Sequence, residues 1–91
     1  MPAAIQDISM FVDESISAAK VAQSLRLGAG ELLESVALFD RFQKSGEKQV
    51  SLAFTLTFRA PDRTLTGDEV SALRERAGAR AAKECGAQIR S

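Results

Sequence analysis

Few side chains in this sequence could carry acid–base, metal or thiol chemistry. The 91 residues contain no histidine and one cysteine, Cys85. Without histidine, histidine-based proton transfer and histidine-ligated metal sites are excluded. A single cysteine cannot form an internal disulfide. Because Cys85 falls within a helical pattern, we expect it to be a small buried apolar residue rather than a reactive thiol.

Paired acids and a glycine pair are the next candidates. Asp13 and Glu14 follow a predicted strand, whereas Asp68 and Glu69 fall in the first turn of a predicted helix, where the helix dipole favours carboxylates. The stretch "RLGAGE" at residues 26–31 lacks the preceding strand and the third glycine of a dinucleotide-binding loop. No nucleophile with an adjacent base is left. We therefore expect a chain that is not an enzyme by itself and uses no metal or cofactor.

A basic stretch follows on the same predicted helix. It consists of Arg74, Arg76, Arg80 and Lys83. A solvated helix face is the simpler interpretation, and a minor surface that steers phosphate groups is the alternative.

Bulk composition limits the partners. The chain has 12 basic and 12 acidic residues, is 45% apolar and 26% charged, and is long enough for one modest core. A zero net charge is not the basic footprint of a protein that holds nucleic acid through phosphates alone. No apolar run approaches the length of about 18 residues that a membrane span requires, so we expect a cytoplasmic protein without a membrane partner.

Hydrophobic periodicity predicts the six elements that would position these residues. Alternation predicts a first strand from Ile5 to Val12, with Ile8, Met10 and Val12 on one face and Asp7, Ser9 and Phe11 on the other. A first helix follows, capped by Ser17 and ended by Gly28 and Gly30. Next come a strand at 34–42, a hairpin turn at 43–48 and a strand at 51–58. A second helix runs from about Gly67 to Cys85 behind a Thr66/Glu69 capping box, and a short strand at 87–90 ends the order.

This order, strand–helix–strand–strand–helix–strand, predicts an α+β fold: a ferredoxin-like βαββαβ sandwich with a four-stranded antiparallel sheet. Right-handed crossovers place both helices on one face of the sheet. The other face would carry the small side chains of the third strand, which are Ser51, Ala53, Thr55 and Thr57. Such a face is either simply solvated or a platform on which planar groups can lie.

Several stretches resemble a known family. They are "ELLESVALFDRF", "SLAFTLTFRAPDRTLTGDEV", the closing "GAQIR", and the opening Pro2 with "IQDIS". Together they are similar to the ferredoxin-fold anticodon-binding (FDX-ACB) domain, the C-terminal module of the bacterial phenylalanyl-tRNA synthetase beta subunit. The resemblance covers Pro2 to Arg90 and implies a single domain over residues 1–91. In the family this module is normally the last part of a much longer chain, and catalysis occurs in a different subunit. A chain of 91 residues would then be an excised domain, a redesigned version of it or a divergent free-standing copy, and we favour an excised or redesigned domain.

The resemblance also implies an RNA site on the open sheet face. In the family this face meets the anticodon loop of tRNA-Phe, so the partners would be the tRNA-Phe anticodon stem-loop and the remainder of the synthetase. The positions that match the family are Asp7, Ser9, Asp40, Phe42 and Ser51. An exposed aromatic can stack on an unpaired base, and a carboxylate can accept hydrogen bonds from guanine.

The second strand presents a conflict of faces. Strict alternation places Val36, Leu38, Asp40 and Phe42 on the same side. If Asp40 and Phe42 face outward, Phe39 is expected inward, and Val36 and Leu38 would be exposed. A β-bulge near Leu38 or partial cover at an edge position would resolve the conflict.

The sequence departs from the family at contact positions. Gln6 replaces a basic residue, Phe42 replaces the usual tyrosine, and Thr55 replaces a frequent arginine. Each change weakens expected RNA contacts without affecting the fold. The alternative function is therefore a structural or self-associating module that uses the same bare sheet. A small-molecule regulatory domain is a third hypothesis, which no ligand motif supports.

Overall fold

The computed structural model describes residues 2–90 and has the predicted order of elements. These are β1 (Ala4–Asp13), α1 (Ala18–Ala29), β2 (Leu33–Phe42), β3 (Gln49–Phe58), α2 (Gly67–Cys85) and β4 (Gln88–Ile89). The strands form one antiparallel sheet in the order β2-β3-β1-β4. The ferredoxin-like α+β fold is thus confirmed.

The two layers share one core. In β3, the residues Val50, Leu52, Phe54, Leu56 and Phe58 are buried, while the residues between them are only partly covered. In β1 the buried positions are Ile8, Met10 and Val12. Val21 and Leu25 of α1 and Val70, Ala77 and Ala81 of α2 close the core from above. Cys85 belongs to this core, as predicted.

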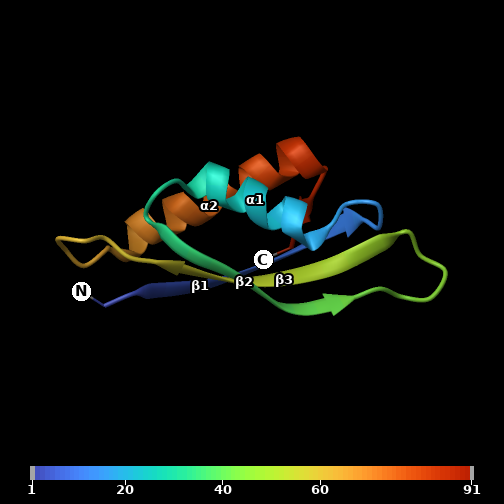
Figure 1. The fold of residues 1–91 in the computed structure, drawn as a ribbon, viewed down its shortest axis with the longest axis horizontal. Coiled ribbons are helices and arrows are strands. Elements are labelled where there is room, and N and C mark those ends of the chain that lie inside the picture. The colour runs from blue at the N-terminus through green and yellow to red at the C-terminus, as the bar shows by residue number, and fades with distance from the viewer. Residues whose placement is uncertain (1, 91) are drawn as a thin grey trace.

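Both helices lie on the same side of the sheet (Figure 1). No part of residues 2–90 covers the opposite face, which carries the residues of β1 and β3 that alternate with the core positions. Within these residues, neither helix has the length and apolar character needed to cross a membrane.

The helix starts follow the predicted caps. The Ser17 hydroxyl accepts a hydrogen bond from the backbone N–H of Lys20 at 3.1 Å. At α2, the Thr66 hydroxyl accepts from Glu69 N–H, and the Glu69 carboxylate accepts from Thr66 N–H, each at 3.1 Å. Arg63 donates to the same carboxylate at 2.6 Å. The hydrogen bond from Arg63, followed by that from Thr66, lowers the pKa of Glu69 to about 2.

The end of α1 corrects one prediction. Gly28 does not end the helix, which continues to Ala29; Gly30 alone forms the C-cap, with φ of 86°. A Cβ atom at Gly28 would lie 2.5 Å from the carbonyl oxygen of Arg76 and 2.7 Å from Cβ of Arg80. Glycine is therefore required at this position because the two helices approach closely here.

The last strand is shorter than predicted. Instead of residues 87–90, β4 comprises Gln88 and Ile89, which pair with Phe11 and Met10. One further backbone hydrogen bond to β1 follows the strand, from Arg90 N–H to the carbonyl of Ser9 at 2.8 Å. Arg90 is thereby fixed beside β1.

Candidate nucleic-acid interface

A row of side chains crosses the open face near one end of the sheet. Ser51 of β3 pairs with Phe42 of β2 on one side and with Phe11 of β1 on the other. Paired residues project from the same face of a sheet. The two phenylalanines are two strand spacings apart, roughly 10 Å, and the small Ser51 side chain lies between them.

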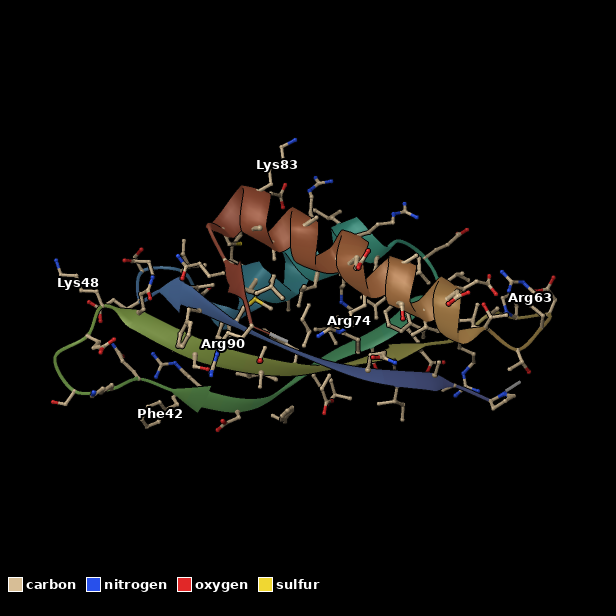
Figure 2. All side chains as sticks on the ribbon, turned by 180° about the vertical axis from the view of Figure 1, so that it is seen from behind. Phe42, Lys48, Arg63, Arg74, Lys83 and Arg90 are labelled. Carbon is tan, nitrogen blue, oxygen red and sulfur yellow. The ribbon has the colours of Figure 1, made fainter. Side chains whose placement is uncertain are left out.

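A β-bulge turns Asp40 and Phe42 toward this face. Val36 and Leu38 pair with the buried Leu56 and Phe54, so they lie on the helix side. The register then shifts between Leu38 and Asp40, and Asp40 pairs with Ala53 on the open side. The bulge near Leu38, one of two predicted solutions, is confirmed. Phe42 projects away from the helices in Figure 2.

The inward orientation predicted for Phe39 is wrong. Phe39 is the extra residue of the bulge and its side chain is 54% exposed. Because a bulge places two residues opposite one on the partner strand, Phe39 has no position of its own in the alternation.

The row borders a hollow of about 390 Å³ on the open face. Its lining residues are Phe11, Asp40, Phe42, Lys44, Glu47, Gln49, Ser51 and Arg90. The lining combines two aromatic rings with two cations and two anions, and Ser51 contributes only a small side chain. Planar groups with hydrogen-bonding edges suit this combination, since rings can stack while charged groups meet the edge.

Phe11 and Arg90 were not among the predicted site residues. The guanidinium carbon of Arg90 lies 4.8 Å from the centroid of the Phe11 ring, a cation–π geometry. Phe11 alternates with the buried residues of β1 in the same way as Asp7 and Ser9, and this alternation correctly predicted that it lies on the open face. Nothing in the local pattern reveals Arg90, because its position depends on the pairing of β4 with β1.

The hairpin loop between β2 and β3 forms the rim of the hollow. Gln43 donates from Nε2 to the Glu14 carboxylate at 2.6 Å and to the Glu47 carbonyl at 2.8 Å. Glu14 N–H in turn donates to the Lys48 carbonyl at 2.7 Å. These bonds attach the loop to the end of β1 and hold Lys44 and Glu47 beside the hollow.

Asp7 and Ser9 share the open face but do not line the hollow. Asp7 pairs with Thr55 and accepts a hydrogen bond from its hydroxyl at 3.1 Å. The backbone carbonyl of Asp7 accepts from Nε of Arg74, which reaches over from α2. Ser9 pairs with Ala53, one step nearer the hollow. The structure thus groups Asp40, Phe42 and Ser51 and leaves Asp7 and Ser9 as a continuation of the surface along β1.

Comparison with known proteins assigns the chain to a family. Residues 1–90 match the "Ferredoxin-fold anticodon binding domain". Among curated relatives, the phenylalanine–tRNA ligase beta subunit of Nocardia farcinica is 53% identical over 91 residues, which is 98% of this chain. Those of Corynebacterium jeikeium and Mycobacterium leprae are 51% and 50% identical over 99% of it. The chain spans 11% of the length of each of these relatives. It belongs to the ferredoxin-fold anticodon binding domain family.

Proposed function

We propose that this chain is the anticodon-binding module of a phenylalanyl-tRNA synthetase beta subunit. In this proposal residues 1–91 form one non-catalytic domain of a longer cytoplasmic protein, and the open sheet face binds the anticodon loop of tRNA-Phe. The observation that carries it is the joint presentation of Phe42, Asp40, Ser51 and Phe11 around one hollow. Family membership and the names of the relatives support the choice of RNA.

Stacking supplies the first interaction. Single-stranded loops are the part of RNA whose bases a protein can reach, and one base stacked on an aromatic ring contributes about 1–3 kcal/mol. Phe42 is 62% exposed, so its ring is available without rearrangement of the core. The Phe11 ring is already covered by Arg90, which leaves Phe42 as the main stacking surface.

Asp40 supplies specificity. An ionised carboxylate only accepts hydrogen bonds, and the Watson–Crick edge of guanine offers two N–H donors. Asp40 is two residues before Phe42 in β2, lines the same hollow and pairs with the small Ala53. A base stacked on Phe42 can therefore direct its edge toward the Asp40 carboxylate. Adenine presents no matching pair of donors. We assign Asp40 to guanine discrimination, and Asp7 and Ser9 to the path of the neighbouring nucleotides.

The isolated chain should bind weakly. Its net charge is zero and the hollow carries two cations and two anions, whereas phosphate contacts usually dominate the affinity of RNA-binding proteins. The remainder of the synthetase would supply the other tRNA contacts.

The test is the affinity of the chain for the tRNA-Phe anticodon stem-loop, compared with the same stem closed by an unrelated loop. We expect the cognate loop to bind roughly tenfold more tightly, which is about 1.4 kcal/mol. Asp40→Asn should reduce discrimination between guanine and adenine in the loop by about 1–3 kcal/mol. Equal affinity for the two stem-loops would contradict the proposal.

A further inference from the structure

A second hollow lies in the helix layer, away from the sheet. It is a shallow, open hollow of about 380 Å³ between the C-terminal end of α1 and the outer side of α2, and its lining residues are Leu27, Gly28, Arg76, Ala79, Arg80 and Lys83. We call it the basic groove. Leu27 is 54% exposed and forms an apolar border. The close helix contact at Gly28 brings α1 against the base of the arginine side chains.

The charge of the basic groove is one-sided. Three of its six lining residues are cations and none is an acid. Within residues 2–90, the side chains of Arg76 and Lys83 have no hydrogen-bond or salt-bridge partner. Arg80 is paired with Glu84, so Arg76 and Lys83 are the two cations of the groove whose charge no carboxylate offsets, in a chain with equal numbers of acids and bases.

The orientation of the Arg80 guanidinium is fixed by Glu84, one turn further along α2. Its Nε donates to the Glu84 carboxylate at 2.9 Å, and the second oxygen of that carboxylate accepts from the buried Ser24 hydroxyl at 2.7 Å. The hydrogen bonds from Ser24 and then Arg80 lower the pKa of Glu84, which keeps it ionised at neutral pH. The terminal nitrogens of Arg80 are left available, and a positioned guanidinium is suited to bidentate recognition of phosphate.

We propose that the basic groove binds phosphate groups of an RNA backbone. At a rise of 1.5 Å per residue, Arg76 and Lys83 are about 10 Å apart along the helix axis, so the three cations can follow a run of consecutive phosphates. Lys83 points away from the side of the sheet where Phe42 lies (Figure 2). The groove therefore contacts an RNA segment other than the bases in the sheet hollow. The choice of RNA over an acidic protein rests on the function proposed above.

The test is a titration of the 91-residue chain with a blunt RNA duplex, followed through backbone amide shifts. A duplex presents phosphates but no unpaired bases, so it does not probe the sheet hollow. We expect shifts at Gly28 and along residues 76–83 at low salt. In the double variant R76Q/K83Q, these shifts should be lost, and the slope of log K against log salt should fall by about 2.

The matched control is R41Q/K48Q, which removes the same charge from residues that line neither hollow. It should retain the groove shifts. Three results would overturn the proposal: no groove shifts at millimolar duplex, equal losses in both double variants, or tighter binding of a polyglutamate peptide than of the duplex at the same amides. Because the probe has no loop, none of these results bears on anticodon binding by the sheet.

Discussion

Phe42 offers the most direct residue-level prediction. Phe42→Ala should weaken binding of the anticodon stem-loop by about 1–3 kcal/mol because one stacked base loses its ring. The free energy of unfolding of the Phe42→Ala variant should differ from that of the wild type by no more than about 0.5 kcal/mol, since the Phe42 side chain is mostly exposed. Affinity by calorimetry and unfolding by urea would measure the two effects.

The matched control is Ile5→Ala. Ile5 is 63% exposed, against 62% for Phe42, and it pairs with Thr57 on the open face far from the hollow. It should leave affinity unchanged. If both variants lose affinity equally, a general apolar contribution and not stacking at Phe42 is responsible.

At this scale the sequence revealed only part of the hollow. Asp40, Phe42 and Ser51 could be predicted because the resemblance identified them, and strand parity placed Phe11 on the right face. Arg90 could not be predicted, since it reaches Phe11 only through the pairing of two distant strands.

At the scale of elements, the bulge in β2 decides which of its side chains lie on the open face of the sheet. Deletion of Phe39 removes the extra residue, and strict alternation from Leu38 then still directs Asp40 and Phe42 outward. We expect the deletion variant to fold and to retain Phe42 beside Ser51, as detected by nuclear Overhauser contacts between them.

Deletion of Thr55 from β3 is the contrasting variant. β3 pairs with β1 without a register shift from Gln49 to Phe58, so this loss would turn the buried residues on one side of the deletion away from the helices and should be clearly destabilising. Burial of Phe42 in the Phe39 deletion variant, or an equal loss in the free energy of unfolding in both deletion variants, would show that Phe39 is an ordinary strand residue.

The cap of α2 gives a pH prediction. The pKa of Glu69 is lowered from 4.5 to about 2, so the group contributes stability above pH 4.5 that is lost as the pH falls toward 2. The stability difference between the wild type and Glu69→Gln should therefore be largest near neutral pH and shrink across this interval. Urea unfolding at a series of pH values would measure it.

Arg63 is the largest cause of that lowered pKa. In Arg63→Gln, the loss of stability attributable to Glu69 should occur at a higher pH, closer to 4.5. A difference between wild type and Glu69→Gln that is constant from pH 7 to pH 2 would contradict the assigned role of the carboxylate.

The helix caps were predictable because they depend on three or four adjacent residues, as at Ser17 and Thr66. The end of α1 was not, since Gly28 is required by α2, which follows much later in the chain. The bulge could be named only as one of two solutions, because its cause is the pairing of β2 with β3.

For the whole molecule, the order of elements and the apolar period of each determined the fold. Right-handed crossovers leave one side of the sheet bare, and the chain consequently has two distinct faces (Figure 1). The sheet side carries exposed rings with balanced charges, and the basic groove on the helix side gathers three cations, of which only Arg80 is paired with an acid. Neither hollow follows from composition, because each gathers residues from at least two elements.

The most direct test of this arrangement is a map of amide shifts produced by the tRNA-Phe anticodon stem-loop, compared with the map produced by a blunt duplex of the same stem. Shifts specific to the loop should fall on Phe11, Asp40, Phe42, Ser51 and Arg90, around the sheet hollow. Loop-specific shifts confined to α1 and α2, or no difference between the two maps at millimolar RNA, would contradict recognition of unpaired bases by the open sheet.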